Sequence, residues 1–435
     1  MKKIIIAACP LAVTSTVMAQ SGTNSPYSQF GLGLLNDQST GFNRGMSGLG
    51  YGFHEHNQVN VKNPASYAYI DSLTFILDAA VGLQVTNFNE NGIKKNDKNA
   101  DFEYAVGAFR LMKNVGMTFG VLPYSNVGYN YKNTANVNAF NSTESINPTY
   151  TNTYDGDGGV HEVFIGAGWK PFKRFSVGFN ASYLWGDITR SVVNSYSDSY
   201  VNTLSKYYKT KMKGYRLNFG VQYTQPLNKN NELTLGLVYE PGHKTNTDPE
   251  CLVISSNSQT AVNDTSRYVI DNGISLPDRF GAGLTWNYKD QLKLGFDYQL
   301  EKWGSVSLPE YIVTNNVASF RLVDGEMKDR SKYTFGGDFC KGEMSRNFFG
   351  RIHYRAGISY VPSYQKINGM DGPKEIQASI GFGIPIINGW NNRSFLNISA
   401  HWINRSADNL IKENTFMVTV GLTFNERWFA KFKVE

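Results

Sequence analysis

The sequence predicts an all-β fold, namely a transmembrane antiparallel β-barrel of about fourteen strands with an N-terminal hatch or plug inside the lumen. Three observations predict this fold. Segments of roughly ten alternating apolar and polar residues repeat along the chain, no apolar run is long enough for a spanning helix, and the links between segments alternate between short and long. Aromatic residues make up 14% and charged residues only 18% of the 435 residues. That composition suits a membrane barrel, whose alternating strands dilute their own hydropathy.

The first residues are typical of a secretory signal peptide. Lys2 and Lys3 are followed by a largely apolar stretch over residues 4–17, and a small-residue cleavage site ends at Ala19. We therefore expect residues 1–19 to be removed. A lipoprotein signal ending at Cys9 is the alternative, but the apolar run before Cys9 is shorter than such a signal needs.

Residues 20–70 do not alternate and are rich in Gly, Asn and Ser, with scattered apolar side chains such as Phe30, Leu32 and Leu34. A structureless loop of this length is uncommon in a compact protein. The apolar side chains favour a plug packed inside the barrel, and the alternative is a disordered periplasmic tail.

Residues 71–426 carry the strand pattern, and 427–435 are expected to form a short periplasmic tail. Between Tyr215 and Thr224, for example, Tyr, Leu, Phe and Val alternate with polar residues and Gly. Such a period of two gives one apolar and one polar face. The pattern predicts strands near 73–88, 101–112, 115–131, 159–170, 173–191, 207–225, 231–246, 277–288, 290–304, 331–341, 349–362, 374–385, 394–405 and 413–425.

Two features favour a membrane barrel over a soluble β-sandwich. Aromatic residues such as Phe280, Trp286 and Tyr288 stand at the ends of the apolar face, where they suit the bilayer interfaces. The links also alternate in length. Those after the second, fourth, sixth and eighth strands are tight, as at Lys113-Asn114 and Lys289-Asp290, whereas those after the third, fifth, seventh and ninth are long and polar. Because an open edge in hydrocarbon leaves backbone groups unpaired, the last strand must pair with the first.

The polar face would line the lumen. It carries charges of both signs, which indicates a crowded, hydrogen-bonded interior more than a wide pore. The residues concerned are Glu103, Glu162, Arg216, Arg279, Asp297 and Arg355.

Other classes of protein find little support. The net charge is +6, but Lys and Arg do not cluster as a nucleic-acid interface requires. His54, Glu55 and His56 lie in the Gly-rich segment and not on a helix with metal spacing, and no Gly-x-Ser-x-Gly motif occurs. We therefore expect no enzyme, no metal and no cofactor. Cys251 and Cys340 fall at opposite ends of the predicted barrel and should not form a disulfide.

Two blocks of sequence resemble the FadL family of outer-membrane transporters. The first is the Gly-rich stretch 41–50 with Asn63-Pro64-Ala65-Ser66 and a strand behind it. The second is the Leu-Pro strand 276–284 with the following strand 292–298 and Lys302-Trp303. Together the blocks cover about a quarter of the chain.

The resemblance implies a plugged fourteen-stranded barrel in the cell outer membrane that moves small hydrophobic compounds, such as long-chain fatty acids or aromatic hydrocarbons. A ligand would be captured in the barrel, the hatch would move, and the ligand would leave sideways beside a kink in the third strand. Asn63, Pro64 and Ala65 would then form the hatch turn. Pro123, Tyr124, Ser125 and Asn126 would be the lateral gate, the alternative being a simple bulge or the rim. Phe30, Leu32 and Leu34 would form the wall of the ligand pocket, or else hold the plug in place.

A second function remains open, because FadL-like barrels also act as scaffolds or binding partners in protein secretion or surface-assembly machines. The polar loops 132–158 and 246–276 would then be docking surfaces, or plain solvated exterior. The expected partners are outer-membrane lipid, a hydrophobic small molecule and other outer-membrane or periplasmic proteins. An apolar cavity beside the hatch would favour transport, and solid polar packing there would count against it.

Overall fold

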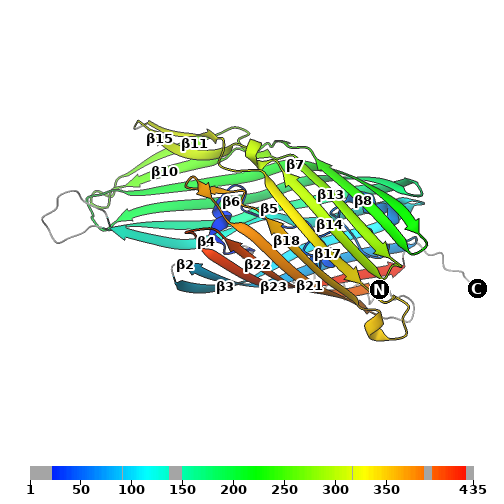
Figure 1. Ribbon diagram of the computed structural model, residues 1–435. Coiled ribbons are helices and arrows are strands. Elements are labelled where there is room, and N and C mark those ends of the chain that lie inside the picture. The colour runs from blue at the N-terminus through cyan, green and yellow to red at the C-terminus, as the bar shows by residue number, and fades with distance from the viewer. Residues whose placement is uncertain (1–21, 91, 137–148, 316, 387–393, 428–435) are drawn as a thin grey trace, which may run out of the picture.

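The computed structural model describes residues 22–90, 92–136, 149–315, 317–386 and 394–427. The predicted signal peptide and nearly all of the predicted C-terminal tail lie outside these ranges. Fourteen strands form one closed antiparallel barrel (Figure 1). They are β2 (Thr74–Glu90), β3 (Ile93–Met112), β4 (Val115–Asn136), β5 (Thr149–Phe172), β6 (Phe175–Tyr196), β7 (Thr203–Asn228), β8 (Asn231–Glu240), β13 (Arg279–Tyr288), β14 (Leu292–Glu301), β17 (Arg330–Phe339), β18 (His353–Val361), β21 (Lys374–Ile386), β22 (Ser394–Ser406) and β23 (Lys412–Arg427).

The last strand closes the barrel against the first, as the sequence predicts. β2 and β23 pair along their length, from Thr74↔Arg427 to Asn89↔Lys412. Every barrel strand therefore has two neighbours along at least part of its length, which is how a closed sheet satisfies its backbone groups in hydrocarbon.

The two faces of the wall differ as the alternation predicts. Phe280 and Leu284 of β13 are exposed on the outside, whereas Arg279 and Thr285 of the same strand are buried. The predicted lumen-facing residues Glu103, Glu162, Arg216, Arg279, Asp297 and Arg355 are all buried. This outward apolar surface is what a lipid-facing barrel requires.

Residues 22–70 lie inside the barrel, in short elements: η2 (Pro26–Gln29), β1 (Leu34–Leu35), α2 (Gly41–Arg44) and η3 (Pro64–Tyr69). Their side chains are mostly buried, including Phe42, Met46 and Phe53, which pack together. Glycines of the wall let this segment approach closely, because a Cβ on Gly236 would lie 1.8 Å from the carbonyl oxygen of Tyr51. No helix in the described part of the chain is long and apolar enough to cross a membrane.

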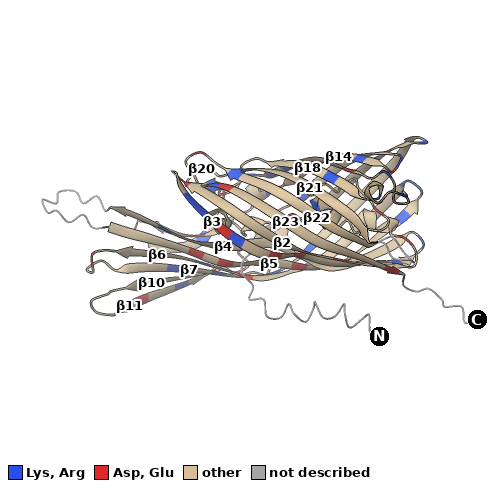
Figure 2. Cartoon of the chain, turned by 90° about the horizontal axis from the view of Figure 1, so that it is seen from below, with Lys and Arg blue, Asp and Glu red and all other residues tan. Residues whose placement is uncertain are grey.

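The strands on one side of the barrel are longer than the sequence predicts. β5, β6 and β7 continue past the end of the wall together with a hairpin of β10 (Glu250–Ser256) and β11 (Asn263–Val269) (Figure 2). A second hairpin, β15 (Leu308–Thr314) with β16 (Val317–Val323), lies on the same side of the membrane. The expected loop 246–276 is therefore partly sheet. Alternation is weak in the outer parts of β5 and β6 because most side chains there are partly exposed on both faces, so neither face needs to be apolar.

Both described cysteines are free and buried. Cys251 lies on the outer hairpin, and Cys340 follows the periplasmic end of β17. The predicted separation of the two thiols is therefore confirmed.

Candidate functional site

The Asn63-Pro64-Ala65 turn begins η3 deep inside the barrel. The Asn63 side chain accepts a hydrogen bond from the backbone N–H of Ala65 at 3.1 Å, and proline fits the first position of a helical turn. Its Nδ2 atom donates to the carbonyls of Tyr51 at 2.9 Å and Val221 at 3.1 Å. Asn63 therefore joins two parts of the N-terminal segment to the wall.

The wall opens between the second and third barrel strands. β3 and β4 pair only from Met112↔Val115 to Ala105↔Val121, whereas β3 stays paired with β2 as far as Ile93. Beyond Val121, β4 has no ladder with β3. We call this opening the wall gap.

The N-terminal segment fills the wall gap. Leu34 and Leu35 of β1 pair with Asn126 and Ser125 of β4, in the place that β3 vacates. The Ser28 hydroxyl also accepts a hydrogen bond from the backbone N–H of Gly128 at 3.1 Å. Residues 22–35, which we call the gap segment, are therefore the element that separates the lumen from the wall gap.

The predicted gate residues 123–126 lie at the start of the wall gap. β4 carries a bulge there, because the register with β5 shifts between Pro123 and Ser125 and leaves Tyr124 as the extra residue. The β4–β5 ladder resumes directly after this bulge, whereas the pairing of β4 with β3 ends at Val121. Ser125 donates to the carbonyl of Leu32 at 2.7 Å, and Asn126 donates to Asp101 of β3 at 2.8 Å. Side chains thus bridge the gap where the backbone does not.

A pocket of about 490 Å³ lies on the outer side of the gap segment. Phe30 and Leu32 line it, together with aromatic residues of β4, β7 and the β15–β16 hairpin. We call it the outer pocket. Its other aromatic lining residues are Tyr129, Tyr208, Tyr311 and Phe320. Leu34, which the sequence groups with Phe30 and Leu32, lines a different cavity inside the lumen.

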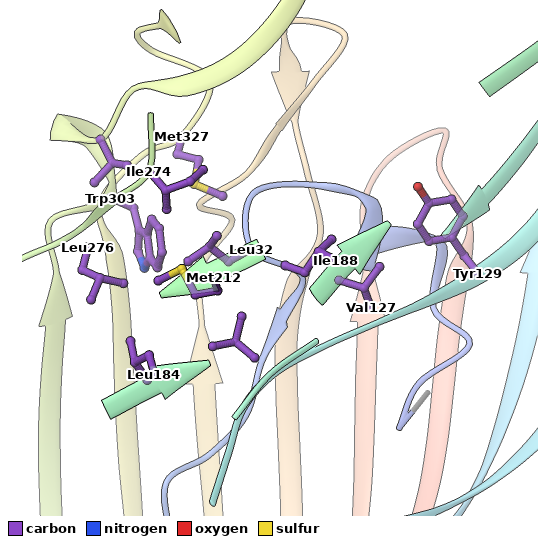
Figure 3. Close-up of a cluster of buried hydrophobic side chains, with 12 residues drawn as sticks. Leu32, Val127, Tyr129, Leu184, Ile188, Met212, Ile274, Leu276, Trp303 and Met327 are labelled. Carbon is purple, nitrogen blue, oxygen red and sulfur yellow. The ribbon is translucent and has the colours of Figure 1, made fainter. Parts of the chain in front are cut away.

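Apolar packing continues from the outer pocket into the barrel around Leu32. Leu32 belongs to a buried cluster that includes Ile188, Met212 and Trp303, and Figure 3 shows Leu32 beside Met212 and Ile188. The cluster gathers residues from the gap segment, from β6 and β7, and from the links around β14. It forms an apolar floor beneath the outer pocket.

The lumen cavity beside the gap segment has the opposite character. It measures about 150 Å³, and charged side chains of both signs line it. They are Arg44, Lys62, Arg216, Arg279, Arg330, Lys332 and Arg405 with Asp37, Asp101, Glu103, Glu240, Glu301 and Glu375. The predicted crowded interior is present, and the cavity beside the N-terminal segment is not apolar.

Ion pairs hold these charges in place. Arg216 contacts Glu162 at 3.0 Å and Glu240 at 3.4 Å, and Arg279 contacts Glu240 at 3.0 Å. Arg44 of the N-terminal segment reaches Glu103 of β3 at 2.7 Å. Removing one partner of such a buried pair leaves the other charge uncompensated, so the network opposes passage of an apolar molecule through the lumen.

The His54-Glu55-His56 stretch lies at the periplasmic end of the segment. His54 stacks on Tyr69 with ring centroids 3.7 Å apart, and Glu55 pairs with Lys293 at 2.6 Å. His56 lies 2.9 Å from Asp71, whose hydrogen bond raises the histidine pKa to about 10. Among the described residues no group of three or more His, Cys, Asp or Glu side chains could hold a metal ion.

Sequence reasoning missed the role of the gap segment at the wall. Ser25 caps η2 by accepting from the N–H of Tyr27, and its hydroxyl donates to Glu413 of β23 at 2.5 Å. The Ser-Pro pair at 25–26 signals a turn, but nothing local indicates which strand the turn would contact.

The whole chain matches a known protein family, and most of it resembles solved structures. A family model described as BamG matches residues 1–435. Among solved structures, the CymD monoaromatic hydrocarbon channel has a TM-score of 0.59 at 14% identity, with 91% of this chain and 99% of that chain covered. The toluene transporter TbuX of Ralstonia pickettii has a TM-score of 0.61 at 12% identity, with coverage of 90% and 99%. A FadL homologue of Pseudomonas aeruginosa has the same TM-score and identity, with coverage of 90% and 98%.

No curated protein matches the chain. The structural likeness confirms the predicted FadL-like fold, and together with the apolar outer face it shows an outer-membrane β-barrel.

Proposed function

The chain belongs to the BamG family, and from that premise and its FadL-like fold we propose that it takes up small hydrophobic compounds from outside the cell. The compound would bind in the outer pocket, move the gap segment, and leave sideways through the wall gap. Long-chain fatty acids and aromatic hydrocarbons are the substrate classes we propose. The observation that carries the proposal is the position of residues 22–35, which contact the outer pocket on one side and fill the wall gap on the other.

Capture is supported by the apolar and aromatic side chains of the outer pocket, which lie there beside charged ones such as Arg190, Glu310 and Lys366. Burying apolar ligand surface gains about 25 cal/mol for each Å² removed from water. Phe30 and Leu32 offer such surface directly on the segment that would have to move. Ligand binding shifts the segment only if the ligand makes better contacts with the moved segment than with the unmoved one.

The sideways exit is supported by the state of the lumen. The charged cavity and its ion pairs lie between the outer pocket and the periplasmic end, and desolvating those charges is costly. The wall gap avoids this network, and a compound leaving there would enter the lipid phase. Neither step uses a cofactor, a metal or a chemical reaction.

The test is uptake by cells with and without the gene, using a panel of labelled fatty acids and aromatic hydrocarbons. We expect uptake of at least one class to fall on deletion and to return with the intact gene, but not with Leu32→Asp, which places a charge on the pocket floor. Unchanged uptake of every compound on deletion would reject the proposal.

A second function, a scaffold or binding partner in a protein secretion or surface-assembly machine, is favoured by a different observation. The charged, ion-paired lumen is typical of structural packing and not of a passage for apolar compounds. The β10–β11 hairpin also extends the sheet well beyond the barrel, where a partner could bind it. A photo-crosslinking residue at exposed Val262 tests this function. Crosslinks to one defined outer-membrane protein, absent when the same crosslinking residue stands at exposed Ile93 instead, together with unchanged uptake on deletion of the gene would support the scaffold.

A further inference from the structure

The turn between β17 and β18, residues 340–352, differs from the other described periplasmic turns. Those turns, such as 113–114 and 173–174, are only a few residues long, whereas this one forms a knob containing η5 (Phe348–Gly350) that extends past the strand ends (Figure 1). Its apolar side chains face outward. Met344 is 89% and Phe349 67% exposed, which is unusual for side chains of this size unless something apolar covers them.

The knob has two attachments. On the lumen side, Glu343 accepts a hydrogen bond from the Asn57 side chain at 3.1 Å and lies 3.6 Å from His56. On the outer side, the hydroxyl of Tyr354 donates to the carbonyl of Phe349 at 3.1 Å. Tyr354 is an exposed residue on the lipid-facing side of β18, so its bond holds Phe349 next to the lipid-facing surface.

An apolar groove of about 480 Å³ begins at the same place on the outer wall. Small residues form its floor, because Gly337 of β17 pairs with Ala356 of β18, and Leu294 of β14 lies on the other side of Gly337. Larger side chains border it, namely Phe335, Phe339, Tyr354 and Ile358. The groove therefore runs along the strands from the knob toward the middle of the membrane.

The knob also carries positive charge without internal compensation. Lys341 and Arg346 are exposed, Arg351 is half-buried, and none of the three has an ion-pair partner among the described residues. The one carboxylate of the knob, that of Glu343, is directed to His56 and Asn57. Lys341 also lines a pocket at this end of the barrel together with Asp290 and Glu343. A phosphate group beside the knob would meet cations whose only acidic neighbour within residues 340–352 is this already bonded carboxylate.

We propose that the knob and the groove together bind one anionic phospholipid of the periplasmic leaflet. One acyl chain lies in the groove over Gly337 and Ala356, and the phosphate is held by Lys341, Arg346 and Arg351. The occupant is a lipid because the groove lies on the lipid-facing wall. Its head group is anionic because the cations of the knob have no ion-pair partners in the described part of the chain. Phe348, Phe349 and Met344 contact the interfacial region, where aromatic side chains are favoured.

Native mass spectrometry of the purified full-length mature chain, incubated in detergent with equal amounts of phosphatidylglycerol and phosphatidylcholine, tests the proposal. We expect a single phosphatidylglycerol adduct that exceeds the phosphatidylcholine adduct several-fold. Ala356→Phe fills the groove and should remove the adduct, whereas Ala282→Phe, at a lipid-facing alanine of β13, should not. Lys341→Gln with Arg346→Gln should equalise the two lipids, whereas Lys173→Gln with Lys229→Gln at other periplasmic turns should keep the preference.

Three results would overturn the inference. Equal retention of both lipids by the unaltered chain would show that the cations do not recognise the head group. Equal lipid retention by Ala356→Phe and Ala282→Phe would show that the acyl chain does not lie in the groove. Folding of each variant is checked independently by the heat-dependent shift in gel mobility that closed barrels show. Crosslinking of the knob to a protein in cells, without a lipid adduct in the purified chain, would assign the surface to a protein instead.

Discussion

The carboxylate of Asp297, on the inner face of β14, accepts a hydrogen bond from the backbone N–H of Tyr51 at 2.9 Å. The same oxygen accepts from the N–H of Gly50 at 2.7 Å. A buried carboxylate of the wall thus binds the main chain of the N-terminal segment directly. The segment is held by the barrel as part of its core and not merely enclosed by it.

Asp297→Ala should loosen this attachment. Hydrogen bonds to a charged acceptor contribute about 1.5–3 kcal/mol each, so we expect the loss of both to lower the free energy of unfolding by about 3–6 kcal/mol. Urea unfolding in detergent measures it. Asp264→Ala, on the exposed strand β11, is the matched control and should change little. Equal stability of the two variants would show that the segment is held elsewhere.

Gly236→Leu should displace the segment and open the lumen. Even a Cβ at this position would lie 1.8 Å from the Tyr51 carbonyl oxygen, so a leucine cannot be accommodated without moving the backbone. In planar bilayers we expect stable ion conductance from this variant and little from the unaltered chain. Ala79→Leu, on the exposed outer face of β2, should stay closed. Equal conductance in all three proteins would contradict a sealed lumen.

Removing the bulge of β4 should close the wall gap. Deleting Tyr124 together with Pro123→Val restores one-to-one register with β5 and a backbone N–H at position 123. We expect uptake to be lost while the barrel stays folded. The matched control deletes Leu227 with Pro226→Val, at the bulge between β7 and β8, and should keep uptake. Full uptake by the Tyr124 deletion would place the exit elsewhere.

The contact of His56 with Asp71 and Glu343 should make stability depend on pH. The hydrogen bond that His56 donates to Asp71, together with the Glu343 carboxylate, raises the pKa of His56 from 6.5 to about 10. The stabilisation is therefore complete below pH 6.5 and is lost as the pH rises through 10. The hydrogen bond from His56 lowers the pKa of Glu343 from 4.5 to about 2, so its contribution is lost as the pH falls through that range.

Melting temperatures between pH 6 and pH 10 test this dependence. The unaltered chain should lose stability toward pH 10, and His56→Gln should show a flatter profile. The size of the effect will be reduced by solvent, because the His56 side chain is 43% exposed. Parallel profiles for the two proteins would show that the contact does not contribute.

Most of the barrel could be predicted from sequence because the direction of each strand side chain follows from its place in the local alternation. Alternation places Arg279 inward and Phe280 outward without any knowledge of partners, and closure follows from the cost of open edges in lipid. Tight turns such as 113–114 likewise fix antiparallel neighbours. The outer extensions of β5 and β6 were missed because most of their side chains are partly exposed on both faces, which weakens the alternation.

The candidate site was predictable only in part. Asn63-Pro64 is recognisable as a cap and first turn, and Pro123 marks a break in pairing. The pairing of Leu35 with Ser125 could not be predicted, since it joins segments far apart in the chain and depends on β3 leaving β4. The assignment of Leu34 to the lumen cavity instead of the outer pocket follows from that same register.

The most direct test of the account locks the gap segment to the wall. Leu35→Cys with Ser125→Cys joins two paired residues of β1 and β4, in a chain with Cys251→Ala and Cys340→Ala. Thr86→Cys with Thr415→Cys, which joins β2 to β23, is the control. Oxidation of the first pair should abolish uptake of the labelled compound and reduction should restore it, while the control pair transports in both states. Undiminished uptake through the oxidised Leu35→Cys/Ser125→Cys barrel would contradict movement of the gap segment and the sideways route with it.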